Sequence, residues 1–182
     1  HCLLRRQRQM CIRDSDYYFK RSIVLITEIS DKEVIGLIIN KQLDYNLKDI
    51  DSSVNEKKIK VFSGGPVNQD NLFFIHDEPE IIKNSKFCYD NLCFGGNYVE
   101  LIKMINEKVF DWKNKVKFFS GYSGWKIEQL NEEINEGSWI IDTNKNNNIF
   151  ENNVKNLWKN KIKKSNPEFK IWLNAPNDPQ DN

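Results

Sequence analysis

The sequence predicts a single α+β domain, in which hairpins come first and mixed helices and strands follow. Its 182 residues are enough for one domain with a substantial core. Short β-branched runs separated by turn signals fill the first half, and three segments of helical periodicity lie in the second. No internal repeat or linker divides the chain, so we expect the domain to cover residues 16–182.

Two apolar runs, residues 17–30 and 34–40, predict a buried hairpin that turns at Asp31–Glu33. Gly36 inside the second run indicates a bulge or the close approach of another backbone. We expect further strands over residues 59–62 and 71–76.

A tight hairpin is predicted over residues 86–94, turning at Asp90 and Asn91, because both residue types tolerate a positive φ. In that register Tyr89 lies opposite Leu92, and Cys88 lies opposite Cys93. Opposed cysteines can come close enough to bond. In a reducing compartment we expect two thiols instead.

Three helices are predicted from their apolar stripes and caps. Asn97 caps the first, with Glu100 in the capping-box position. We expect the second helix from about Gly124 to Asn135, and strands over 116–119 and 138–142 on either side of it. The three stripes are Tyr98, Leu101, Ile102, Ile105 and Val109; Ile127, Leu130 and Ile134; and Val154, Leu157, Trp158 and Ile162.

The charge distribution argues against a nucleic-acid partner. The chain carries a formal charge of +1, but four arginines and one aspartate give residues 1–15 a charge of +3, which leaves −2 for the rest. A mildly acidic domain lacks the basic surface that phosphate backbones require. Residues 1–15 show no strand or helix period, and we predict a foreign or artefactual, poorly ordered segment that is dispensable for folding.

Membrane insertion and metal binding are not expected either. No run approaches the roughly 18 apolar residues that a membrane span needs, and no signal segment is recognisable. We therefore expect a cytoplasmic protein. Outside the first segment the sequence has Cys88, Cys93 and His76 as soft ligands, which do not form a zinc pattern, so we expect no metal and no cofactor.

The stretch "GYSGW", residues 121–125, raises the question of a ligand site. A glycine-rich turn that opens a helix can bind an anion, but no phosphate-binding pattern is present. On a helix Trp125 and Gln129 would share the polar face, opposite the apolar stripe. Either Trp125 packs beneath the glycine turn, which we favour, or it lines a binding surface with Tyr122 and Gln129.

Catalytic chemistry has little support in the sequence. "SGGPV", residues 63–67, is typical of a sharp corner, with φ fixed at Pro66. His76 is the only histidine outside the first segment, and a hydrogen-bonding role at a strand end is the favoured interpretation. No nucleophile elbow accompanies it. An enzyme with an unrecognised pocket near His76 and Cys93 stays the alternative.

Taken together, the motifs resemble those of the YqgE/AlgH family of bacterial proteins, in the version found in Bacteroidetes. In order they are "FKRSIVLI" (19–26), "IGLIINK" (35–41), "GGPV" (64–67), "LFFIH" (72–76), "FGGN" (94–97), "GYSGW" (121–125) and "GSW" (137–139). The resemblance covers residues 16 to about 165.

The resemblance implies a bent, mixed or antiparallel, partly barrel-like sheet with three main helices packed on it. It implies no established enzyme activity. The family is often described as a transcriptional regulator, although no standard DNA-binding motif is present, and a DNA-binding regulator is our second alternative.

Two departures from the family pattern bear on the fold and the site. Relatives have a first strand of the "G-x-L-L-I-A-x-P" kind where this chain has residues 1–15, so we expect an unpaired sheet edge there. Relatives also often have an aromatic residue at the position of Cys93, so a pocket there would be altered.

The leading hypothesis is a non-enzymatic regulatory domain that binds a protein or small ligand. The sequence identifies neither that partner nor the oligomeric state. The candidate binding residues are Asn40, Gly64, Gly65, Pro66, Tyr122, Trp125 and Gln129.

Overall fold

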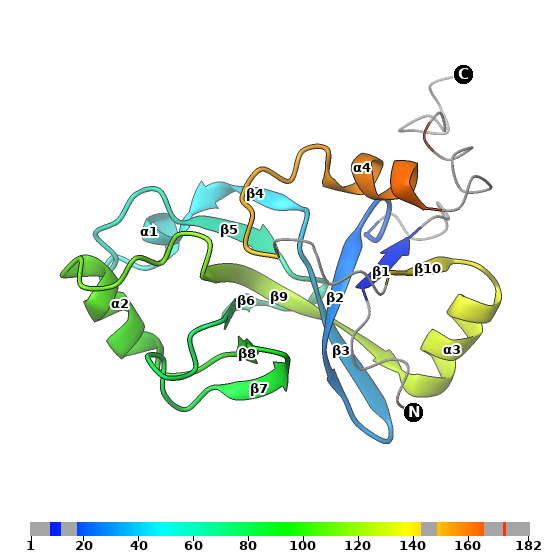
Figure 1. Cartoon of the computed structure of the whole chain (residues 1–182), viewed down its shortest axis with the longest axis horizontal. Coiled ribbons are helices and arrows are strands. Elements are labelled where there is room, and N and C mark those ends of the chain that lie inside the picture. Colours follow the sequence, from blue (N-terminus) through cyan, green and yellow to red (C-terminus); the bar gives the residue numbers. More distant parts are fainter. Residues whose placement is uncertain (1–7, 12–17, 143–148, 166–172, 174–182) are drawn as a thin grey trace.

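The computed structural model describes residues 8–11, 18–142, 149–165 and 173, and shows one α+β domain (Figure 1). In chain order its elements are β1 (Arg8–Cys11), β2 (Ile23–Ile29), β3 (Glu33–Ile38), β4 (Gln42–Asn46), α1 (Leu47–Ile50), β5 (Lys60–Ser63), β6 (Val67–His76), β7 (Lys86–Tyr89), β8 (Leu92–Phe94), α2 (Tyr98–Asn106), β9 (Val116–Lys126), α3 (Ile127–Asn135), β10 (Trp139–Asp142) and α4 (Leu157–Lys164).

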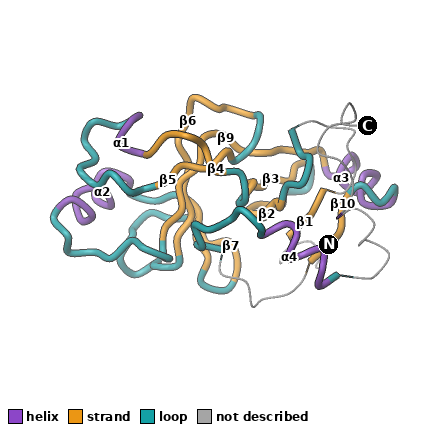
Figure 2. Tube along the Cα trace, turned by 90° about the horizontal axis from the view of Figure 1, so that it is seen from above, coloured by secondary structure: helices purple, strands orange, loops and turns teal. Residues whose placement is uncertain are grey.

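The long strand β9 holds the sheet together. The strand order is β10-β1-β2-β3-β9-β6-β8-β7, and β4 and β5 lie off this path. The first part of β9 pairs with β6 on one side and, in parallel, with β5 on the other, while its last residues pair with β3. The sheet therefore bends along β9, with α2 near one end of the molecule and α3 near the other (Figures 1 and 2). The bent, mixed and partly barrel-like sheet that the family resemblance implied is confirmed.

The described core forms three hydrophobic clusters. One lies under α2 and α1 and includes Leu101 and Phe118. A second lies beside α3 and contains Leu130 and Trp125. The third is covered by α4, through Trp158, and joins the two halves of the sheet. The three predicted helical stripes supply apolar residues to these three clusters, which is why the periodicity located the helices.

Between β5 and β6 the chain crosses over β9, and the crossing requires glycine. A Cβ on Gly64 would lie 2.1 Å from the carbonyl oxygen of Gly121, and one on Gly65 would lie 2.2 Å from that of Tyr122. Gly121 itself has φ +70°. The amide of Gly64 donates to the carbonyl of Ser120 (2.9 Å), and the Gly64 carbonyl accepts from the amide of Ile38 (2.9 Å). The predicted corner at "SGGPV" is thus a backbone crossing between two sides of one strand.

The first hairpin is confirmed as β2 and β3, and Gly36 is a point of close approach. A Cβ on Gly36 would lie 2.5 Å from Cγ1 of Val24. The register of this hairpin shifts between Ile26 and Glu28, on the opposite strand. The predicted N-cap at Asn97 is confirmed, since its Oδ1 accepts from the amide of Glu100 at 3.2 Å. The reciprocal capping-box bond is not formed: the Asn97 amide donates to the carbonyl of Lys83, and the Glu100 side chain accepts from Nδ2 of Asn97 instead.

Three local predictions are wrong. The second helix does not begin at Gly124, because residues 123–126 continue β9 and pair with β3; α3 begins at Ile127. Val109 does not belong to the buried stripe: α2 ends at Asn106 and Val109 is 71% exposed. Cys93 lies opposite Phe87 rather than Cys88, because a bulge shifts the hairpin register, although Tyr89 does face Leu92. Both cysteines are free thiols, as expected.

The N-terminal segment also needs a correction. Arg8–Cys11 form β1, which pairs with β2 and β10 in antiparallel fashion. The expectation that residues 1–15 contain no strand is therefore wrong for these four residues, and β2 is not left unpaired. The rest of that segment lies outside the described residues, and its dispensability stays a prediction.

Candidate functional site

An irregular stretch of β6 forms one wall of a candidate site. Between Val67, opposite Tyr122, and Leu72, opposite Ser120, β6 advances five residues while β9 advances two. The surplus residues leave the regular ladder as a wide bulge. Asn68 takes a positive φ of 50° at its start. The bulge thus exposes four polar residues, Asn68, Gln69, Asp70 and Asn71.

Beside this bulge lies a cleft of about 560 Å³. It forms between the bulge, the α1 corner and the first residue of α2, three segments distant in sequence. Its volume lies within the roughly 300–1,000 Å³ that is usual for small-molecule sites. The lining residues are Tyr45, Ile50, Asp51, Gln69, Asp70, Asn71, Leu72, Tyr98 and Ser120.

Tyr98 and Asp51 form the polar pair of the cleft. The Tyr98 hydroxyl donates to Oδ2 of Asp51 at 2.6 Å, and the amide of Ser53 donates to Oδ1 at 2.9 Å. The Tyr98 bond, more than any other influence, lowers the pKa of Asp51 below its usual value. Burial, followed by the hydrogen bond to Asp51, raises the pKa of Tyr98. The pair therefore holds a carboxylate and a neutral phenol at neutral pH.

The other end of the cleft meets the glycine crossing. The Ser120 hydroxyl donates to the backbone carbonyl of Gln69 at 2.5 Å, and the Gln69 side chain donates to the hydroxyl of Tyr18. That hydroxyl is also 3.2 Å from Oγ of Ser63. The ammonium of Lys41 donates to the backbone carbonyl of Tyr18. These bonds fix the bulge against β9 and so give this wall of the cleft a defined position.

The structure does not gather the sequence-predicted binding residues into one site. Asn40 holds the chain before β2: its Oδ1 accepts from the amide of Ile23 (2.7 Å), and its Nδ2 donates to the carbonyl of Arg21 (2.9 Å). Gly64 and Gly65 are buried in the crossing, and Pro66 beside them is exposed.

The remaining three predicted residues lie on β9 and α3. Tyr122 is half-buried with its ring 5.6 Å from that of Phe73. Trp125 is 4% exposed, which confirms the packing interpretation. Its cover is not the glycine turn, however, but Phe19 and Trp139, whose ring centroids lie 5.2 and 5.7 Å away.

Gln129 is exposed on α3, where its amide donates to Oε1 of Glu133 at 2.8 Å. Figure 1 shows α3 at the opposite end of the molecule from α1 and α2, and Gln129 is not among the residues that line the cleft beside those two helices. A binding role for these individual residues stays a prediction.

His76 and Cys93 do lie opposite each other, on β6 and β8. Both are fully or almost fully buried. Nε2 of His76 is 3.1 Å from the carbonyl of Gly95, and Nδ1 accepts from the amide of Glu78 at 3.1 Å, so the backbone occupies both ring nitrogens. Burial lowers the pKa of His76 and raises that of the Cys93 thiol. This geometry is that of a neutral structural histidine beside a protonated thiol.

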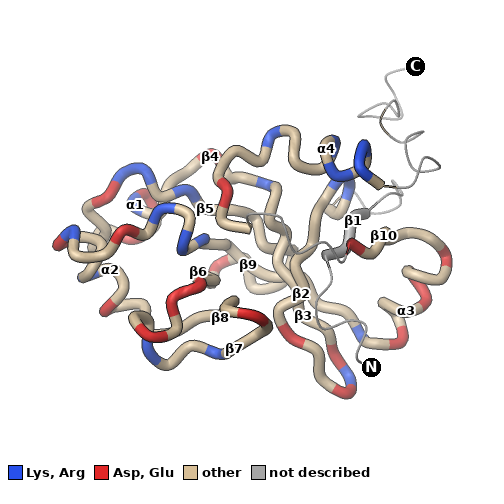
Figure 3. Tube along the Cα trace, viewed as in Figure 1, with Lys and Arg blue, Asp and Glu red and all other residues tan. Residues whose placement is uncertain are grey.

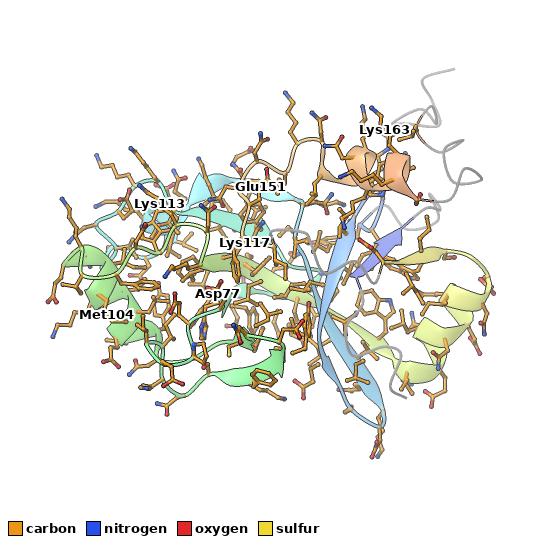
Figure 4. The ribbon with its side chains drawn as sticks, in the orientation of Figure 1. Asp77, Met104, Lys113, Lys117, Glu151 and Lys163 are labelled. Carbon is orange, nitrogen blue, oxygen red and sulfur yellow. The ribbon has the colours of Figure 1, made fainter. Side chains whose placement is uncertain are left out.

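Sequence reasoning missed a buried cation, Lys117 on β9. Its ammonium lies 3.9 Å from the centre of the Phe62 ring and donates to the backbone carbonyls of Ile149 (3.3 Å) and Glu151 (2.9 Å). Lys117 and Glu151 lie close together in the centre of Figure 4. The contacts tie the segment before α4 to the sheet. A lysine within "VKFFS" was the available signal, since neighbouring strand positions there are apolar.

Membrane and metal criteria can be applied to the part of the chain that the structure describes. None of its helices has the length and apolar character needed to cross a bilayer. Nor does that part bring together three or more histidine, cysteine or acidic side chains in a metal-binding arrangement. Lys and Arg gather on α4, while acidic residues follow α3 and both signs mix around α1 and α2 (Figure 3).

Fold and site together define a class: a bent-sheet α+β domain with an aromatic and acidic cleft beside a backbone crossing. The sequence profile of the AlgH-like family matches residues 11–170, most of the chain. The chain therefore belongs to the AlgH-like (UPF0301) family.

Individual relatives agree with this assignment. A UPF0301 protein of Cytophaga hutchinsonii is 33% identical over 91% of this chain and 91% of its own length. One from Parabacteroides distasonis is 35% identical over 90% of this chain and 83% of its own length.

Solved structures show the same fold at low identity. The crystal structure of a Corynebacterium diphtheriae protein matches with a TM-score of 0.72 at 16% identity, over 93% of this chain and 91% of that one. The solution structure of the AlgH protein from Pseudomonas aeruginosa matches with a TM-score of 0.67 at 19% identity, over 82% of each chain.

Proposed function

We propose that this protein is a non-enzymatic, regulatory ligand-binding domain, and that the cleft beside the β6 bulge receives the ligand. The observation that carries the proposal is the cleft itself, which combines an apolar wall, two tyrosines and two carboxylates in a volume of about 560 Å³. Binding sites are typically apolar hollows with a few convergent polar groups. Hydrogen bonds within the walls, such as Ser120 to Gln69, support a site that is formed before ligand arrives.

The enzyme alternative finds no matching geometry at His76 and Cys93. A general base needs a free ring nitrogen within reach of the nucleophile, and both nitrogens of His76 face backbone groups. The DNA-binding alternative predicts salt-sensitive binding to duplex DNA. Acidic residues at the cleft, Asp51 and Asp70, would repel a phosphate backbone there.

A blocking substitution tests the proposal. Asn71 is an exposed residue of the bulge that lines the cleft, so Asn71→Trp fills the cleft mouth without disturbing the core. The matched control is Asn135→Trp, at the exposed end of α3. A fragment library is screened by amide chemical-shift mapping. We expect hits to shift cleft resonances in wild type and in Asn135→Trp, but not in Asn71→Trp. Hits that map elsewhere, or survive Asn71→Trp unchanged, would refute the cleft as the ligand site.

A further inference from the structure

We infer that the cleft is selective for a small organic cation, an ammonium or guanidinium group carried on an apolar or aromatic body. This inference rests on the proposed function and adds the chemical class of the ligand.

The charges that line the cleft are of one sign. Asp51 and Asp70 are the charged residues among its described lining, and no lysine or arginine accompanies them. Lys48 belongs to the neighbouring helix α1 but does not line the cleft. An anionic ligand would therefore meet two carboxylates without a compensating cation, whereas a cation would gain from both.

Hydrogen bonds fix the Asp51 carboxylate in position and keep it ionised. The Tyr98 hydroxyl and the Ser53 amide donate to its two oxygens at 2.6 and 2.9 Å, and the Ser53 side chain also hydrogen-bonds to the carboxylate. An ionised carboxylate has about four acceptor positions, so further donors can still bind. All three hydrogen bonds, that of Tyr98 most of all, favour the charged form, and the pKa of Asp51 is lowered accordingly. The carboxylate therefore stays ionised without an ammonium partner.

The rest of the lining favours an organic body over a metal ion. Tyr45 and Tyr98 place aromatic rings in the lining, and ring faces attract organic cations. Ile50 is 51% exposed at the cleft, although large aliphatic side chains are usually buried. The cleft brings two carboxylates together, and the described residues assemble no group of three or more acidic, histidine or cysteine side chains that could hold a metal ion.

Three probes that share a phenethyl body and differ in the terminal group test the inference: phenethylamine, phenethyl alcohol and 3-phenylpropanoate. Each is titrated into the full chain at neutral pH and followed by amide chemical shifts of cleft residues. We expect phenethylamine to bind at least tenfold more tightly than the neutral alcohol, and the carboxylate to bind least. Because charge drives the difference, it should shrink in high salt.

Variants separate this inference from the proposed function. The double variant Asp51→Asn, Asp70→Asn should bind phenethylamine about tenfold more weakly and so lose its preference for the amine over the alcohol. Glu132→Gln, on the exposed face of α3, removes one charge outside the cleft and should change neither. Asp70→Asn alone, at an exposed position, repeats the test if the double variant does not fold, with a smaller loss expected.

The outcomes are distinct. Equal binding of all three probes in the cleft, or preference for the carboxylate, overturns the cation inference but leaves a binding cleft. Loss of phenethylamine binding in Asn71→Trp together with loss of its preference in the aspartate variants supports both proposals. Absence of cleft shifts with every probe and every library fragment overturns both.

Discussion

Replacing Gly64 with alanine should strongly destabilise the fold, because the crossing over β9 has no room for a methyl group. The new Cβ would lie 2.1 Å from the carbonyl oxygen of Gly121, a backbone atom that cannot rotate away. Relief requires the two backbones to separate by about 1 Å, and overpacking of this kind typically costs about 1–3 kcal/mol. Separation also stretches the bonds from Gly64 to Ser120 and from Ile38 to Gly64, each worth about 0.5–1.5 kcal/mol. Together these terms predict a loss of about 2–6 kcal/mol in the free energy of unfolding.

The matched control is Gly124→Ala, three residues beyond Gly121 on the same strand. A Cβ there would approach nothing closer than 3.5 Å, and φ is not positive. That variant should be neutral or slightly more stable, because alanine restricts the unfolded chain. Urea unfolding followed by tryptophan fluorescence measures both. A Gly64→Ala variant within about 1 kcal/mol of wild type would show that the crossing relaxes easily, and would refute the steric account.

Three further predictions concern side chains. Trp125→Ala should cost about 3–5 kcal/mol by urea unfolding, as truncation of a buried aromatic usually does; a change below about 0.5 kcal/mol would mean that its contacts with Phe19 and Trp139 contribute nothing. Tyr98→Phe should lower the free energy of unfolding at pH 7, and by progressively less in acid. The pKa of Asp51 is lower in the folded than in the unfolded chain, so the ionised carboxylate stabilises the fold above about pH 3.8. That stabilisation is lost as the pH falls through the pKa that Asp51 has in the folded protein. An equal effect of Tyr98→Phe at pH 7 and pH 3.5 would contradict that. Burial lowers the pKa of His76, so this histidine takes up a proton in the unfolded chain before it does in the folded one as the pH falls below 6.5. The wild-type protein should therefore lose more stability between pH 7.5 and 5.5 than His76→Gln does. If the stabilities of the two proteins fall in parallel over that range, His76 is not a buried neutral imidazole.

Periodicity and capping residues predicted those helices and strands in which the local sequence preference matches the packing of the folded protein. The stripe that begins at Tyr98 supplies Leu101 and Ile105 to the core under α2, and the Asn97 cap forms as its spacing indicates. The misplaced start of the second helix has a clear physical cause. Residues 123–126 have a helix-opening sequence, yet they pair with β3, whose edge β9 covers. Tertiary pairing outweighs the weak intrinsic preferences of a four-residue segment.

The cleft could not have been predicted in the same way. Its walls come from β4, α1, β6, α2 and β9, and no short motif joins them. The periodicity of α2 predicts that Tyr98 packs against the core. It does not reveal that the Tyr98 hydroxyl reaches Asp51, 47 residues earlier in the chain. The β6 bulge is also invisible locally, because a register shift depends on which strand lies opposite. Sequence patterns report periodicity, whereas this site depends on topology.

The glycine motifs act on the candidate site indirectly, through the backbone. Gly64 and Gly65 let the chain pass from the β5 side of β9 to the β6 side, directly over Gly121. β6 then begins against Tyr122 but resumes regular pairing only at Leu72, opposite Ser120, and the surplus between these points is the bulge that forms one wall of the cleft. A residue that widens the crossing should therefore also displace the bulge, through the Ser120 to Gln69 bond. The glycine motif therefore sets the position of one wall of the proposed cleft, through the crossing and the Ser120 to Gln69 bond.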